Sequence, residues 1–143
     1  AELAERAPLA FVDWARNGDP DLWARAHLAP LLHPASTPQA WREWVFYGSP
    51  RFSGQRLVVA PGASAHGVEP GVYSVFAWTG TGTWGGAELV GGRPGHDEAL
   101  VVHATATAGV EVRNTGPEEF STYVFSGPDL HPEATLLGAG WAR

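Results

Sequence analysis

The chain has 143 residues and a mass of 15.2 kDa, which fits a single domain with a core of its own. Its 18 glycines and 12 prolines supply so many turns that they argue against a helix bundle. The absence of cysteine excludes a disulfide scaffold, a zinc ribbon and thiol catalysis. A net charge of −6 without a basic run argues against nucleic acid as a partner, because phosphate neutralisation requires clustered positive charge.

The sequence also contains no apolar run of the roughly 20 residues that a membrane-spanning helix requires, and no signal peptide is visible at its start. We therefore expect a cytoplasmic protein without a membrane partner. Position 1 is Ala rather than Met, so we expect the chain to be a processed or excised piece of a longer protein.

The first 40 residues predict an N-terminal arm with one short helix. Asp19 can cap a helix, Pro20 suits its first turn and Asp21 complements its dipole. We expect this helix to run from Pro20 to about His27. Three prolines then forbid regular structure, namely Pro30, Pro34 and Pro38. Residues 28–39 are therefore expected to form an extended arm that wraps the body.

The next part of the chain predicts short strands separated by glycine and proline turns. In chain order the expected strands are Trp41–Tyr47, Gln55–Ala60, Gly71–Thr79, a strand from the corner at Trp84 to about Val90, Glu98–His103, Gly109–Asn114 and Phe120–Phe125. Six to eight short strands at this spacing are typical of an all-β sandwich or barrel. The expected organisation is an arm over 1–40, a barrel over 41–130 and a tail over 131–143.

Three segments of this β-rich part carry a family resemblance. Arg56–Ser64 is a strand that enters a Pro-Gly turn, Trp78–Trp84 is a glycine-rich corner, and Val110–Gly116 ends in Asn-Thr-Gly, with Phe125–Asp129 following it. In this order and spacing they resemble the motifs of the cupin superfamily. The resemblance covers residues 41–130 and implies a double-stranded β-helix, which is a small jelly-roll barrel.

A narrower resemblance concerns bacterial proteins with two cupin domains, which are often described as sugar-phosphate isomerase-like. It is carried by Phe11–Pro20, by Trp44–Gly48 and by the pair Asp97-Glu98. This resemblance implies that the chain is one cupin unit of such a protein.

The cupin resemblance also implies where a metal ion would be held. A metal cupin presents two His separated by one residue, then a Glu, then a third His, all pointing into the barrel. Counted from the motif residues Gly80 and Asn114, the corresponding positions here are His66, Val68, Tyr73 and Val110. Because a single imidazole does not hold a catalytic divalent ion against water, we expect no metal cofactor.

An alternative metal site stays open. His66, Glu69 and His103 would form a two-His-one-carboxylate arrangement of the kind that binds Fe, Mn, Ni or Zn. Glu69, however, precedes a Pro-Gly pair that indicates an exposed turn, and His103 lies at the end of an expected strand. The ordinary interpretation of each His is a polar residue that is exposed or hydrogen-bonded to the backbone.

Aromatic residues on the expected strands indicate a ligand site of another kind, because a barrel lined by aromatics can hold a sugar ring or a planar metabolite. The predicted pocket is lined by His66, Tyr73, Trp78, Trp84 and His103. Aromatics on strands also serve as core or as dimer contacts. The expected partners are therefore a small molecule and either a second copy or a second cupin domain.

The favoured function is a cupin unit that lacks most metal ligands and that binds a small molecule, dimerises or supports a larger cupin protein. The alternative is a divalent-metal cupin enzyme, an isomerase or oxygenase, that acts on a sugar or another small polar metabolite. Residues alone leave both functions open, and they leave open whether the chain is an enzyme at all.

Overall fold

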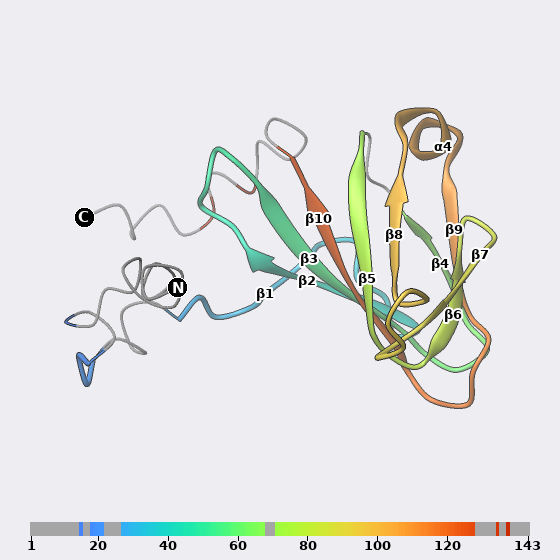
Figure 1. The fold of residues 1–143 in the computed structure, drawn as a ribbon, viewed down its shortest axis with the longest axis horizontal. Coiled ribbons are helices and arrows are strands. Elements are labelled where there is room, and N and C mark those ends of the chain that lie inside the picture. Colours follow the sequence, from blue (N-terminus) through green and yellow to red (C-terminus); the bar gives the residue numbers. More distant parts are fainter. Residues whose placement is uncertain are drawn as a thin grey trace, which may run out of the picture.

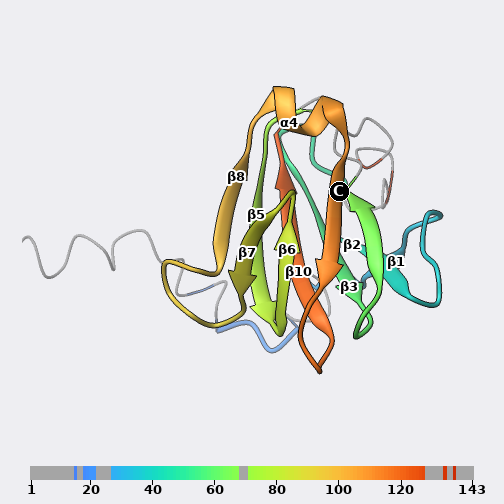
Figure 2. The ribbon, with the colours of Figure 1, turned by 90° about the vertical axis from the view of Figure 1, so that its right-hand side faces the viewer.

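In the computed structural model, the chain folds into two antiparallel sheets that pack against each other (Figures 1 and 2). The structure describes residues 27–67 and 71–127, together with positions 15, 18–21, 134 and 137. None of the helices in these residues has both the length and the apolar character needed to cross a membrane. The all-β jelly-roll architecture that the sequence predicts is confirmed.

The larger sheet has six strands and the smaller sheet has four. In spatial order the larger sheet consists of β1 (Leu31–Leu32), β2 (Ala40–Phe46), β3 (Ser53–Val59), β10 (Phe120–Ser126), β5 (Tyr73–Thr79) and β8 (Glu98–Val101). The smaller sheet consists of β4 (Ser64–Gly67), β9 (Val110–Asn114), β6 (Thr81–Trp84) and β7 (Ala87–Val90). The last strand in the sequence, β10, lies between β3 and β5 and pairs with both, so it joins the two halves of the larger sheet.

The core lies between the sheets and follows from the alternation of side chains along each strand. On β5, Tyr73, Val75 and Ala77 are buried, whereas Ser74 and Trp78 are exposed. The core also contains Ala40, Leu57, Val59, Trp84, Leu89, Val101, Ala106, Val110, Val112, Phe120 and Val124. Full burial of one Val, Leu or Phe side chain stabilises a fold by about 1.5–3 kcal/mol. These residues therefore hold the two sheets together without a disulfide.

The segment after β8 differs from the sequence prediction. The sequence predicts a strand over Glu98–His103, but β8 ends at Val101 and a helix, α4, occupies His103–Ala108. Three of the six residues of α4 are Ala, the strongest helix former. Gly109 ends the helix at a φ of 83°, and its N–H donates to the carbonyl of Ala106. His103 therefore begins a helix, and the expected strand end was wrong.

The proline-rich arm contributes an edge strand. Its two residues, Leu31 and Leu32, pair with Trp44 and Glu43 of β2, whereas the sequence predicts no regular structure between the prolines. Both leucines keep their N–H groups, so a two-residue ladder forms between the prolines that flank it. The arm therefore extends the larger sheet rather than only covering it.

The N-terminal helix expected from Pro20 to His27 and the tail expected over 131–143 lie mostly outside the described residues. In the described part of the tail, Ala134 is buried against Trp44 and Tyr47 in a second, smaller cluster. That cluster is separate from the core between the sheets.

Asn114, at the end of β9, ties the two sheets together. Its side chain is 1% exposed, and Nδ2 donates to the carbonyls of Val59 at 2.8 Å and Glu118 at 2.7 Å. Its Oδ1 accepts a hydrogen bond from the N–H of Gly116 at 2.9 Å. The motif asparagine thus stabilises the turn after β9 and joins that turn to β3.

Candidate functional site

A hydrogen-bonded aromatic pair spans the barrel interior. Tyr73 on β5 and Trp84 on β6 are both buried, and their ring centroids lie 6.2 Å apart in an edge arrangement. Trp84 Nε1 donates to Tyr73 Oη at 3.1 Å. Because β5 belongs to the larger sheet and β6 to the smaller one, the pair links the two sheets with its polar atoms directed at each other.

Tyr73 and Val110 occupy two of the positions that hold a Glu and a His in a metal cupin. Both side chains lie in the barrel interior. Tyr73 belongs to the aromatic pair, and Val110 on β9 packs in the core at 1% exposure. Val68 and Glu69 lie outside the described residues. Among the residues that are described, no three of the types His, Cys, Asp and Glu come close enough together to hold a metal ion. Of the alternative set His66, Glu69 and His103, the structure describes the side chain of His66.

His66 lies on the outside of the smaller sheet. It stands opposite Glu111 in the register of β4 and β9, while the neighbouring pair, Ala65 and Val112, faces the core. Residues that are directly opposite in an antiparallel pair share one face, and successive pairs alternate. His66 and Glu111 therefore both point away from the barrel interior, and both are exposed.

Among the members of the predicted ligand pocket whose side chains are described, the structure brings Tyr73 and Trp84 together. Trp78 lies on the outer face of β5 and is 59% exposed, because it follows the buried Ala77. His66 is exposed on the other sheet. The backbone of His103 begins α4, and its side chain lies outside the described part of the structure.

We expect Tyr73→Phe to lower the free energy of unfolding by about 1–2 kcal/mol, because the buried indole N–H of Trp84 loses its acceptor. Urea denaturation followed by tryptophan fluorescence measures this loss. Tyr123→Phe, on the outer face of the larger sheet, is the matched control and should change stability by less than about 0.5 kcal/mol. Equal losses in the two variants would contradict a role for the interior hydrogen bond.

A cleft of about 290 Å³ lies between β2 and β4. Its lining residues are Ala35, Thr37, Ala40, Arg42, Ser64, Ala65 and His66. Arg42 is 7% exposed, and its Nη2 donates to the backbone carbonyl of His66. Ser64 and His66 are exposed at the mouth, and Arg113 stands opposite Ser64 in the β4–β9 register. The cleft thus places a buried arginine beside exposed polar residues of β4.

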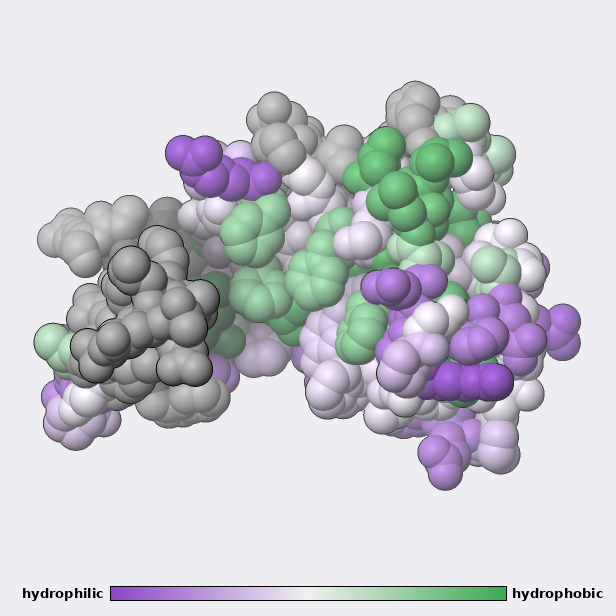
Figure 3. All heavy atoms as spheres, viewed as in Figure 1, coloured by the Kyte–Doolittle hydropathy of each residue, from purple (hydrophilic) through white to green (hydrophobic). Residues whose placement is uncertain are grey.

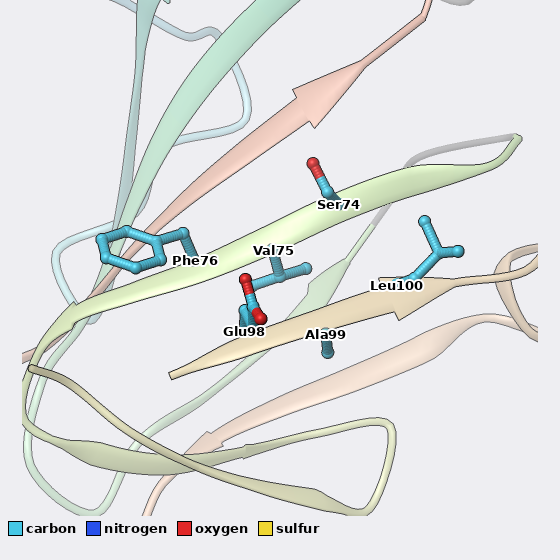
Figure 4. A pocket seen from close by; sticks show the side chains of 6 residues that line it. All are labelled: Ser74, Val75, Phe76, Glu98, Ala99 and Leu100. Carbon is cyan, nitrogen blue, oxygen red and sulfur yellow. The ribbon is translucent and has the colours of Figure 1, made fainter. Parts of the chain in front are cut away.

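A second hollow, of about 410 Å³, lies on the outer face of the larger sheet between β5 and β8 (Figure 4). It is lined by Ser74, Val75, Phe76, Glu98, Ala99 and Leu100. Figure 4 shows Ser74, Phe76, Glu98 and Leu100 directed to one side of the two strands, and Val75 and Ala99 to the other. The hollow is therefore open to the outside and separate from the barrel interior.

Sequence reasoning did not single out Arg42. Its signal is the alternation Ala40, Arg42, Trp44, in which an arginine takes a core-facing place on a strand. Arg42 lines a cleft because β4 forms the other wall, and β4 lies more than 20 residues later in the chain.

No protein-family model and no curated protein matches this sequence. Solved structures do match the fold. An uncharacterised conserved protein with a double-stranded β-helix domain from Klebsiella pneumoniae is 19% identical, with a TM-score of 0.52 over 69% of this chain and 85% of that chain. An RmlC-like cupin protein from Ralstonia eutropha is 8% identical, with a TM-score of 0.51 over 70% of this chain and 63% of that chain.

The polyketide cyclase RemF from Streptomyces resistomycificus is also similar. It is 10% identical, with a TM-score of 0.52 over 73% of this chain and 75% of that chain. At these identities the similarity carries the fold alone. The same fold supports many activities, so what this chain does must be argued from its own residues.

Proposed function

Since the chain has the cupin fold, we propose that it is a small-molecule-binding unit of a larger cupin protein and that its ligand is anionic. The observation that carries the proposal is the buried guanidinium of Arg42 on the lining of the β2–β4 cleft. A guanidinium is planar and always charged, and it binds a carboxylate or phosphate through two parallel hydrogen bonds. Its hydrogen bond to the His66 carbonyl orients it before a ligand arrives.

The remainder of the cleft suits a small ligand. Its volume of about 290 Å³ lies close to the lower end of the range of about 300–1,000 Å³ that is usual for ligand pockets. Ser64 and His66 are polar residues of the lining, and alanines form much of the wall. Arg113 adds positive charge beside Ser64. A small organic acid or a sugar phosphate has the matching size and charge.

The metal-enzyme alternative requires His66, Glu69 and His103 to converge. His66 points away from the barrel interior, which favours the binding proposal over this arrangement. Metal content of the untagged chain, measured by plasma mass spectrometry, separates the two. We expect far less than one metal ion per chain, whereas a stoichiometric ion that survives dialysis would favour the enzyme.

We expect phosphate, a sugar phosphate or a dicarboxylate to raise the melting temperature of the wild-type chain. At a ligand concentration of about 100 times Kd the stabilisation is about 2.7 kcal/mol, which corresponds to a shift on the order of 8 °C. Arg42→Gln should abolish the shift, because it removes both the charge and the donor fork. Calorimetric titration of the same ligand checks that the shift reports binding.

Because Arg42 is buried, the melting temperature of each variant is first measured without ligand, and only the ligand-induced change is compared. Arg42→Lys should keep a reduced shift, since it retains the charge without the planar fork. Arg51→Gln, an exposed arginine outside the cleft, is the matched control and should keep the full shift. A full shift in Arg42→Gln, or none in the wild type at millimolar ligand, would overturn the proposal.

A further inference from the structure

Six aromatic rings form an unbroken series on the outer face of the larger sheet. In order of contact they are Phe52, Phe46, Phe125, Tyr123, Trp78 and Phe76. Successive ring centroids lie between 5.8 and 6.4 Å apart. We call this series the aromatic ladder. It crosses from the β2–β3 turn over β10 to β5, so strands far apart in sequence build one continuous surface.

Within the described part of the chain, three rings of the aromatic ladder are exposed, namely Trp78, Phe52 and Phe46. Leu100 on the adjoining strand β8 and Val102 directly after it are exposed as well. Figure 3, viewed as in Figure 1, shows hydrophobic side chains gathered over the strands of this face. Monomeric proteins rarely expose a contiguous apolar patch beyond a few hundred Å². This face therefore has the character of an interface.

In one row of this face an arginine and a glutamate flank two rings, and Glu43 of β2 continues the row beyond the arginine. Arg56 on β3 is opposite Tyr123 on β10, Tyr123 is opposite Phe76 on β5, and Phe76 is opposite Glu98 on β8. The row thus reads cation, ring, ring, anion across four neighbouring strands. Arg56 is held in place by Glu43 at 3.2 Å and lies 4.8 Å from the Trp41 ring centroid.

We propose that two copies of this chain stack these outer faces about a two-fold axis that runs along the strands between β10 and β5. Such an axis exchanges β10 with β5 and β3 with β8 of the partner. Tyr123 then lies over the partner's Phe76, and Arg56 lies over the partner's Glu98. In this orientation each ring faces a ring of the partner, and the arginine faces the partner's glutamate. The surface therefore matches a second copy of the same chain.

The hollow at Ser74 fits the same arrangement. Phe125 is opposite Ser74 in the β10–β5 register, so the two-fold axis places Phe125 over the partner's Ser74. Ser74 is small and exposed, and the hollow of about 410 Å³ around it is bordered by Phe76, Glu98 and Leu100. The phenyl ring of the partner's Phe125 fills this space. The two-fold axis produces the same contact in both copies.

The dimensions of the face agree with a dimer contact. The axis superposes four strands at about 4.8 Å, the longest of seven residues at about 3.3 Å, which gives a contact of roughly 19 by 23 Å. Side-chain relief raises the accessible area above this flat footprint, toward the roughly 800 Å² per partner of a standard interface. Facing sheets pack about 10 Å apart, a gap that rings of this size fill.

Sedimentation equilibrium on the full chain tests the proposal. We expect the wild type at high micromolar concentration to sediment at twice 15.2 kDa. Ser74→Trp fills the hollow without removing any core contact and should weaken the dimer at least about tenfold. Glu98→Arg places like charges over the partner's Arg56 and should also weaken it about tenfold. Thermal unfolding of each variant checks that the fold is intact.

Two further variants sharpen the result. Arg56→Glu combined with Glu98→Arg exchanges the charges and should restore most of the affinity that Glu98→Arg loses. Glu88→Arg, on β7 of the smaller sheet, makes the same charge change elsewhere and should leave the dimer intact. A monomeric wild type at high micromolar concentration would overturn the proposal, and a loss of stability in Ser74→Trp would then indicate that the chain covers the face itself. A dimer that is unaffected by Ser74→Trp and Glu98→Arg would overturn it as well.

Discussion

Gly80→Ala should lower the free energy of unfolding by about 3 kcal/mol or more, which corresponds to a fall in melting temperature on the order of 10 °C. Gly80 joins β5 to β6 with a φ of +77°, a conformation that side chains rarely adopt. A Cβ there would also contact the Glu119 carbonyl oxygen, and it would lie 3.0 Å from Phe120 Cα. Backbone atoms cannot rotate away as a flexible side chain can, so the strain and the clash add.

Gly92→Ala is the matched control for this substitution. Gly92 has a φ of +70°, close to that of Gly80, but a Cβ there would meet nothing within 4 Å. Only the backbone strain is left, so we expect a loss of about 1 kcal/mol. Differential scanning calorimetry of both variants separates the two contributions. Equal losses would show that the close approach at the β5–β6 corner has no energetic consequence.

Asn114→Ala should destabilise the fold by about 3 kcal/mol. The substitution removes three hydrogen bonds and leaves the carbonyl of Val59 without its amide partner beside the core. Asn114→Asp should destabilise the fold at least as much at neutral pH, because a carboxylate oxygen would face the two carbonyls that the amide now satisfies. Equilibrium unfolding in urea measures both variants.

Thr115→Ala is the neighbouring control, because Thr115 is exposed and follows directly in the same turn. We expect it to change stability by less than about 0.5 kcal/mol. If Asn114→Ala were as mild as Thr115→Ala, the link from the β9 turn to β3 would have no energetic role. The three hydrogen bonds of Asn114 would then make no measurable contribution to stability.

Local residue patterns were sufficient to predict most strands of this barrel. Gly71–Thr79 was expected as a strand and contains β5, Gly109–Asn114 contains β9, and Phe120–Phe125 is β10 without its last residue. In each of these runs β-prone residues alternate between the core and the outside, and glycine or proline lies close by. The strand predicted over Glu98–His103 was wrong at its end, because β8 stops at Val101 and an alanine-rich helix begins at His103. The helix propensity of the three alanines outweighs continuation of the strand at this point.

The candidate site was much less predictable. Counting between motifs placed His66 on the inside of the barrel, whereas the register of β4 against β9 directs it outward. A shift of one residue reverses the face of every side chain on a strand, and no local pattern sets that register. Tyr73, counted on β5, did fall in the interior, since alternating apolar residues on that strand identify the face.

Local patterns specify the class of fold, because turn residues, strand propensity and the periodicity of apolar residues act over a few neighbouring positions. Which side chains meet depends on how the strands pair and pack in three dimensions. Arg42 and His66 line one cleft although 24 positions separate them. The aromatic ladder draws on three strands that are not consecutive in the chain, β2, β5 and β10, and on the β2–β3 turn. Pairing partner, register and sheet order are set by burial summed over the whole barrel, and burial of that kind has no local signature.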